Sequence, residues 1–168
     1  AARNKGVNAI YNAMSDIEWF RNYKYSKSSE LFGDVKMTVT QVNAGTQHNV
    51  IPDSCSYVVD IRSNECYSNS ELLEIIKSHV KSEVKARSTR LNSSSISLEH
   101  PLVRRAIEMG RKPYGSPTLS NQALLNIPTL KMGPGDTARS HTANEYVLVS
   151  EIREGMELFC KMLDGLRL

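Results

Sequence analysis

The sequence predicts a two-part protein in which a small α+β unit is followed by a shorter α/β segment. Over residues 1–98 the apolar residues follow helical or strand spacing in the order helix, strand, strand, helix, strand. That order is typical of a small antiparallel sheet covered on one face by two helices. The composition changes near Glu99, and residues 99–168 offer only helices, one short strand and a Gly/Pro-rich loop. We therefore expect a domain boundary there and a second part, 99–168, that is incomplete, since it is too short to close an α/β layer unaided.

The first predicted element is an amphipathic helix over residues 5–20. Its apolar side chains recur at spacings of three and four, which places them on one helical face. That face is expected to pack on the core and comprises Val7, Ile10, Met14, Ile17 and Phe20.

Two strands follow, over residues 35–42 and 55–62. Both alternate apolar and polar side chains, which predicts strands with one face in the core and one in solvent. The core-facing positions would be Val35, Met37, Val39, Tyr57, Val59 and Ile61. The loop between them, "NAGTQHNVIPDS" at 43–54, is longer than a hairpin needs, and such loops are often functional.

Ser68 and Glu71 form a capping box that predicts the start of the second helix. Its apolar stripe continues through Leu72, Leu73, Ile76, Val80 and Val84. A short strand is expected around Ile96 and Leu98, after a serine-rich run.

In the second part, Pro101 predicts a first helical turn, and that helix should end near Gly110. A short strand is expected at 127–132. Ser150 should cap the last helix, whose apolar stripe is Ile152, Met156, Phe159 and Leu163.

Composition excludes several classes of protein. Lysine and arginine number 21 against 18 acidic residues, and the net charge of +3 is too small to favour nucleic-acid binding. The strands also lack the paired aromatic residues of an RNA-binding sheet. No apolar run is long enough for a bilayer, and no signal peptide is recognisable. Cys55, Cys66 and Cys160 form no CxxC pair, which indicates reduced thiols and a cytoplasmic location.

Four histidines could take part in chemistry. His79 lies in a predicted helix beside lysines, where a solvated helical histidine is expected, and His100 precedes Pro101 at a helix start, where a boundary role is expected. His48 and His141 lie in loops. His141, in "KMGPGDTARSHTANEYV" at 131–147, could be a reactive or ligating group, and on its own it could equally be a surface loop histidine.

Two stretches taken together resemble one family. "GTQHNVIPDSCSYVVDIR" at 45–62 resembles the lid-domain signature of the zinc-dependent deacylases and exopeptidases that include acetylornithine deacetylase and succinyl-diaminopimelate desuccinylase. "KMGPGDTARSHTANEYV" resembles the same family's C-terminal motif, and the Gly-Val-Asn-Ala-Ile run near the start also matches. The resemblance extends over essentially the whole chain.

The resemblance implies a lid or dimerisation domain at 1–98, with two helices on a four-stranded antiparallel sheet, and the C-terminal part of an α/β zinc-peptidase-like catalytic domain at 99–168. The chain opens with Ala1, Ala2 and Arg3 rather than methionine, so we expect residues upstream of it. Implied partners are a second copy through the lid, the N-terminal part of the catalytic domain, and a small N-acyl amino acid. Neither nucleic acid nor membrane is expected.

The resemblance also implies roles for individual residues. His141 would ligate one of two zinc ions, or of two cobalt ions, whose other ligands and general base lie upstream, so no catalytic residue is expected in this chain and one histidine would not retain the metal. Asn49, Arg62, Gly133, Gly135 and Ser120 would bind substrate, with Arg62 suited to a bidentate grip on a carboxylate. An alternative for Arg62 is a surface ion pair with Asp60. Glu145 would orient or cap rather than ligate, and Asn121 stands where relatives commonly carry aspartate.

The implied reaction is metal-assisted amide hydrolysis, in which zinc polarises the acyl carbonyl and activates water. The motif "KMGPGDTARSHTANEYV" and "LSNQAL" at 119–124 favour an N-acetyl- or N-succinyl-ornithine deacylase of arginine biosynthesis. Two rivals remain open. One is a succinyl-diaminopimelate desuccinylase or related peptidase, and the other, for the isolated chain, is a non-catalytic dimerisation and substrate-binding module.

Overall fold

The structure, a computed structural model, describes residues 6–167. It divides into two compact units, Ala1–Ser93 and Ser94–Leu168. The chain start at Ala1, Ala2 and Arg3, and the predicted helix start at residue 5, lie outside the described residues.

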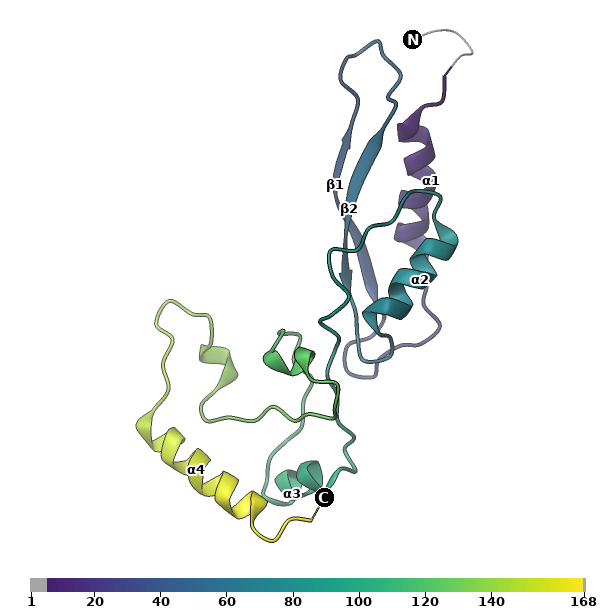
Figure 1. The fold of residues 1–168 in the computed structure, drawn as a ribbon. Helices are drawn as coiled ribbons and strands as arrows, with labels where there is room; N and C mark the ends of the chain where they lie inside the picture. The colour runs from purple at the N-terminus through teal and green to yellow at the C-terminus, as the bar shows by residue number, and fades with distance from the viewer. Residues whose placement is uncertain (1–5, 168) are drawn as a thin grey trace. The chain divides into compact units, whose positions relative to one another are not determined.

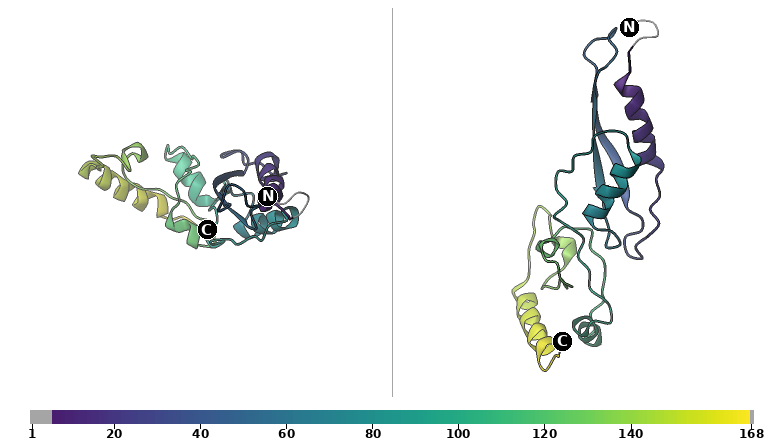
Figure 2. Two further views of the ribbon diagram at one scale, coloured as in Figure 1. Left: turned by 90° about the horizontal axis from the view of Figure 1, so that it is seen from above. Right: turned by 45° about the vertical axis from the view of Figure 1, so that its right-hand side comes forward.

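Two helices and two strands make up the first unit. α1 spans Ala9–Asn22, β1 spans Lys36–Ala44, β2 spans Cys55–Arg62 and α2 spans Asn69–His79. Both helices lie along the hairpin of β1 and β2 (Figure 1), and the further views in Figure 2 agree. The predicted order of helix, strand, strand and helix is confirmed.

β1 and β2 pair in antiparallel register, with Met37 opposite Ile61 and Val39 opposite Val59. The register shifts between Val39 and Gln41, which is a β-bulge. Side chains along the first half of β1 and all of β2 alternate between partly buried and exposed, as the sequence pattern predicts. The partly buried face includes Met37, Val39, Tyr57, Val59 and Ile61.

Tyr25, Val35, Tyr67 and Leu72 form the buried core of the first unit. Burial raises the pKa of the Tyr25 hydroxyl to about 12. The core therefore brings the link before β1 and the segment from β2 into α2 together, and this anchors the hairpin to the start of α2.

The four-stranded sheet that the resemblance implies is not found, because the sheet in residues 6–167 has two strands. The strand expected around Ile96 and Leu98 is irregular chain, in which the Ser95 carbonyl accepts from Thr129 N–H at 3.3 Å and the Ser97 carbonyl accepts from His100 N–H at 3.1 Å. A strand depends on a ladder of hydrogen bonds to its neighbour, and the bond from Thr129 to Ser95 does not by itself make a ladder.

α2 ends earlier than its apolar stripe predicts, at His79, so Val80 and Val84 are not helical. The cause lies in α1. The Asp16 carboxylate accepts hydrogen bonds from Lys81 N–H at 3.1 Å and from Ser82 N–H at 2.9 Å. Two amides that could have continued the helical ladder are therefore bound to a side chain of another helix.

α1 is capped by Asn8, whose side chain accepts from Ile10 N–H at 2.9 Å. Its buried residues are Ala13, Asp16 and Phe20. Part of the predicted apolar stripe is turned away from the core, since Val7 is 73% and Met14 is 58% exposed, whereas Phe20 is buried. Asp16 explains this rotation, because a buried carboxylate must reach its hydrogen-bond donors.

The second unit is built from short helices and long irregular connections. α3 spans Pro101–Glu108, the 3-10 helices η1 and η2 span Asn121–Leu124 and Thr137–Arg139, and α4 spans Val149–Leu163. α3 lies beside the C-terminal end of α4 (Figure 1), where Arg105 Nη2 donates to the Asp164 carbonyl at 2.9 Å. The helix predicted from Pro101 is confirmed, and His100 caps it by accepting from Leu102 N–H.

The strand expected at 127–132 is irregular chain, so the described part of the second unit contains no α/β layer. The last helix is present, but its N-cap is Leu148 and not Ser150. Much of its apolar stripe is exposed, at Ile152, Met156 and Leu163. Among the helices of residues 6–167, none combines the length and apolar character needed to cross a membrane.

Candidate functional site

His141 lies in the connection between η2 and α4, with its side chain in solvent. Its φ of 59° makes it the one non-glycine residue with positive φ in the described chain. Histidine adopts this left-handed conformation more readily than most side chains, yet it still costs free energy and is uncommon. Such a conformation persists only where the surrounding contacts hold it.

Glu145 supplies the nearest of these contacts. Its Oε2 accepts the backbone N–H of His141 at 3.0 Å, and its Oε1 accepts the Ser140 hydroxyl at 3.4 Å. The Thr142 hydroxyl donates to the Arg139 carbonyl at 2.8 Å. The Glu145 carboxylate therefore fixes the backbone of His141, a geometry that suits the orienting or capping role expected for it.

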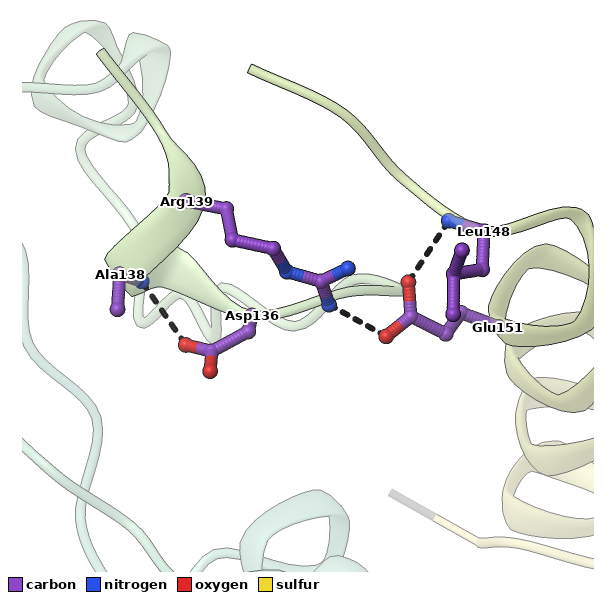
Figure 3. Close-up of polar contacts among 5 residues, drawn as sticks. All are labelled: Asp136, Ala138, Arg139, Leu148 and Glu151. Atoms are coloured by element: carbon purple, nitrogen blue, oxygen red, sulfur yellow. Dashed lines mark hydrogen bonds and ion pairs between the residues drawn. The ribbon is translucent and has the colours of Figure 1, made fainter. Parts of the chain in front are cut away.

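Arg139 and Glu151 anchor this connection to α4 (Figure 3). The Arg139 guanidinium forms an ion pair with Glu151, and the two side chains are only 19% and 25% exposed. Glu151 Oε2 also accepts Leu148 N–H at 2.8 Å, which closes the first turn of α4. Hydrogen bonding from Arg139 holds the pKa of the Glu151 carboxyl below its ordinary value, and the same bond raises the pKa of Arg139.

The guanidinium of Arg139 also lies over the ring of Tyr146, 4.7 Å from its centroid. This is a cation–π contact. Arg139 precedes His141 by two residues and Tyr146 follows it by five, so their contact closes the short turn that carries His141.

The Gly-Pro-Gly run at 133–135 packs against α4. A Cβ placed on Gly155 of α4 would lie 3.3 Å from Pro134 Cβ. One placed on Gly135, whose φ is +85°, would lie 3.3 Å from Val147 Cγ2 and 3.8 Å from Glu151 Oε2. Gly135 is therefore required by backbone conformation and by close packing, whereas a Cβ on Gly133 would meet nothing within 4 Å.

The remaining predicted substrate residues occupy three places. Asn49 lies in the exposed loop between β1 and β2. Arg62 ends β2, and its side chain is 78% exposed. Its Nε donates to Asp60 Oδ2 at 2.8 Å, so the surface ion pair predicted as its alternative role is present. Ser120 caps η1, where its hydroxyl accepts from Gln122 N–H at 3.3 Å, and Asn121 begins that turn.

Gly133 and Gly135 thus lie before η2 and His141 after it, all in the second unit with Ser120, while Asn49 and Arg62 belong to the first. Arg139, Tyr146 and Glu151 were not predicted. The role of Glu151 could have been predicted, since glutamate at the third helical position is typical of a capping box. Such a box ordinarily has serine or threonine at the N-cap, and the leucine found there made the pattern hard to recognise.

The donors around His141 do not make a metal centre by themselves. Within residues 6–167 there is no group of three or more His, Cys, Asp or Glu side chains able to hold a metal ion. The carboxylate nearest to His141 along the chain, Glu145, is already bonded to Ser140 and His141 N–H. A hydrolytic zinc site needs about three protein ligands, so the described residues do not fit zinc as a complete set.

His48 and His79 offer no alternative centre. His48 is exposed in the loop between the strands, and His79 stacks on Trp19 with 5.1 Å between ring centroids at the end of α2. His79 is exposed in the last turn of α2, as expected of a solvated helical histidine, and its stacking on Trp19 is an additional contact.

Comparison with known proteins identifies relatives. Residues 1–88 match the family described as peptidase dimerisation domain, of the M20 class. The chain is 27% identical, over 95% of its length and 48% of the relative, to proteins of two Mycobacterium tuberculosis strains provisionally named succinyl-diaminopimelate desuccinylase. It is 29% identical, over 81% of its length and 42% of the relative, to an Aeropyrum pernix protein provisionally named LysW-lysine/LysW-ornithine hydrolase. The chain spans about half the length of the curated relatives it matches.

Proposed function

Because the chain belongs to the M20 peptidase dimerisation domain family, we propose that it forms part of a metal-dependent amidohydrolase that removes the acyl group from an N-acyl amino acid. The observation that carries the proposal is the held turn at His141. An exposed imidazole at positive φ, fixed through its own amide by Glu145, has the preorganisation expected of a ligand.

In this proposal His141 supplies one metal ligand, and the remaining ligands and the general base come from the other half of the parent protein. Zinc is the metal expected, with cobalt as a substitute. The relatives' length supports this division, since the chain covers 48% and 42% of them. Residues 99–168 would then be the C-terminal segment of the catalytic domain, and residues 1–98 the lid.

We propose N-acetyl- or N-succinyl-ornithine as the substrate class. The motif around His141 supports an ornithine derivative as substrate, and the Aeropyrum pernix relative is named as a hydrolase of LysW-lysine and LysW-ornithine. Succinyl-diaminopimelate, named for the Mycobacterium tuberculosis relatives, is supported equally and is the alternative. Arg62, Asn49, Ser120, Gly133 and Gly135 are the proposed substrate contacts, with Arg62 exchanging Asp60 for the substrate carboxylate.

We also propose that the first unit forms a homodimer. β1 and β2 make a two-stranded sheet in the described chain, so each has one unpaired edge available for pairing. α1, which packs on β1, presents an apolar face to solvent at Ile10, Tyr11 and Met14. The free thiols of Cys55, Cys66 and Cys160 support a cytoplasmic location.

A second function is proposed for the isolated chain, namely a non-catalytic dimerisation and substrate-binding module. The observation favouring it is the incomplete donor set around His141 within residues 6–167.

Hydrolysis assays separate these proposals. The chain should be tested alone and mixed with a separately made N-terminal half of its parent protein, against N-acetylornithine, N-succinylornithine and succinyl-diaminopimelate. Turnover only in the mixture, and its loss in His141→Ala, would support the hydrolase, and the preferred substrate would identify the acyl group. No turnover in the mixture with any of the three substrates would leave the dimerisation module as the function.

A further inference from the structure

We propose that Arg139 and Glu151 are positioning residues for His141, acting as a clamp that holds the turn in the conformation that presents the imidazole. This inference rests on the proposed role of His141 as a ligand. Neither side chain is expected to touch substrate or metal, because each acts through the backbone of the turn.

The Arg139–Glu151 pair lies on both sides of the turn that carries His141. Arg139 ends η2, and Glu151 lies in the first turn of α4, so their ion pair joins the two elements that bracket His141 (Figure 3). Both side chains are largely withdrawn from solvent, at 19% and 25% exposure. An ion pair shielded in this way is screened less by salt than one on an open surface.

Each partner of the ion pair has a further contact that restricts its movement. Glu151 is held by Leu148 N–H at 2.8 Å, so its position follows the start of α4. Arg139 lies over Tyr146, 4.7 Å from the ring centroid. The planar guanidinium can make both contacts at once, which a lysine ammonium could not reproduce.

The clamp of Arg139 and Glu151 is connected to His141 through the turn that follows Arg139. Residues 139 to 146 form a closed turn, because Arg139 contacts Tyr146 at its ends while Glu145 accepts His141 N–H inside it. Asp136 Oδ1 accepts Ala138 N–H at 2.8 Å and fixes the approach to Arg139 (Figure 3). Releasing Arg139 from Glu151 would open the turn and let His141 leave its positive φ.

The test begins with the chain itself. In Arg139→Gln, hydrogen exchange of the His141 amide should rise roughly fivefold or more, and the strong NOE between its Hα and amide proton, typical of positive φ, should weaken. Glu151→Gln should raise the exchange rate of the His141 amide in the same way. Glutamine can still accept from Leu148 N–H, but it has no charge with which to pair Arg139. The double variant should be no worse than either single variant, because both remove the same pair.

Arg153→Gln is the matched control, since Arg153 is an exposed arginine on α4, the helix that carries Glu151. Exchange of α3 amides measures whether the unit as a whole has loosened. An unchanged His141 amide in Arg139→Gln, or an equal effect in Arg153→Gln, would overturn the inference.

A second arm measures cobalt affinity of the chain mixed with the N-terminal half of its parent. Weaker cobalt binding in Arg139→Gln, by roughly fivefold, together with loss of binding in His141→Ala, would support the inference. Unchanged affinity in Arg139→Gln, with binding still lost in His141→Ala, would overturn it and leave the proposed function intact. If His141→Ala also binds cobalt normally, the proposed function itself fails and the inference fails with it.

Discussion

The Glu145 carboxylate accepts the backbone N–H of His141 at 3.0 Å, so the residue four positions after the histidine sets the backbone of the histidine itself. Within such a turn a carboxylate committed to an amide and to the Ser140 hydroxyl stabilises the local conformation. This relationship gives Glu145 a role that differs from metal ligation and can be tested separately.

Glu145→Ala should release the His141 amide, because no acceptor of similar reach replaces the carboxylate. We expect faster hydrogen exchange at His141 and Ser140 in Glu145→Ala, and a smaller increase in Glu145→Gln, whose amide oxygen can still accept one bond. Exchange rates measured by NMR check this. Equal rates in Glu145→Ala and the wild type would show that the carboxylate does not hold the turn.

His141→Gly should stabilise the second unit, because glycine adopts a φ of 59° without the steric cost that a Cβ imposes. The expected gain is about 1 kcal/mol, reduced by the greater chain entropy of glycine when unfolded. Urea denaturation followed through a probe in the second unit measures it. A loss of stability comparable to a core mutation would mean that the imidazole makes packing contacts of its own.

Gly135→Ala and Gly133→Ala form a matched pair within one motif. Gly135 has positive φ and a close neighbour in Val147, so alanine there should destabilise the second unit by about 1–2 kcal/mol. Gly133→Ala should be nearly neutral, since its Cβ would meet nothing within 4 Å. Thermal unfolding of both variants checks the difference, and equal melting temperatures would contradict it.

Asp16→Asn should destabilise the first unit. Asp16 is 4% exposed and accepts from Lys81 N–H, from Ser82 N–H and from the Ser82 hydroxyl at 2.6 Å. An asparagine amide would lose the charge-assisted hydrogen bonds, and its NH2 group would face the N–H and O–H donors of Lys81 and Ser82. The expected loss in the free energy of unfolding is about 2–3 kcal/mol. Glu18→Gln on the exposed side of the same helix is the control and should be neutral.

The same carboxylate predicts a pH dependence. Burial raises the pKa of Asp16, but hydrogen bonds from Ser82 and Lys81 outweigh it and the net pKa lies below the ordinary value of 3.8. A carboxyl with a lowered folded pKa stabilises the fold above its unfolded pKa, and this contribution is lost as pH falls through the folded value. Below about pH 4, the urea concentration at the midpoint of unfolding should therefore decrease with falling pH more steeply in the wild type than in Asp16→Asn. Equal slopes of the urea midpoint against pH in the two proteins would contradict the assignment of this pH dependence to Asp16.

The proposed dimer predicts a mass twice that of the chain in light scattering. Lysine at Ile10 and Met14 would place charges on the exposed apolar face of α1 and should shift the mass to that of one chain. Met156→Lys, at an equally exposed methionine of α4, is the control and should leave the mass unchanged. A dimer that persists in the Ile10/Met14 variant would remove that face from the interface.

Elements whose stabilising contacts are local were predictable from sequence. The capping box at Ser68 and Glu71, the proline at the start of α3 and the alternation over β2 each depend on neighbours within a few residues, and all three elements are present. The predictions of strands near Ile96 and at 127–132 were wrong, because a strand depends on a partner that its own sequence does not specify.

Long-range contacts account for the other errors. Asp16 ends α2 from 65 positions away in the chain, and the same buried carboxylate turns part of the apolar stripe of α1 outward. In the candidate site, the Gly/Pro-rich sequence at 133–135 made an irregular connection before His141 predictable, and the roles proposed for these residues remain predictions. The pairing of Arg139 with Glu151 could not be read from spacing, since it requires α4 to pack against the turn.

The most direct test of the central claim is a zinc titration of the chain alone and of the chain mixed with the N-terminal half of its parent, using the wild type, His141→Ala and the loop control His48→Ala. We expect tight zinc binding only in the mixture, retained in His48→Ala and lost in His141→Ala. Tight binding by the chain alone, or by the mixture carrying His141→Ala, would contradict the assignment of His141 as one ligand of a site completed from outside this chain.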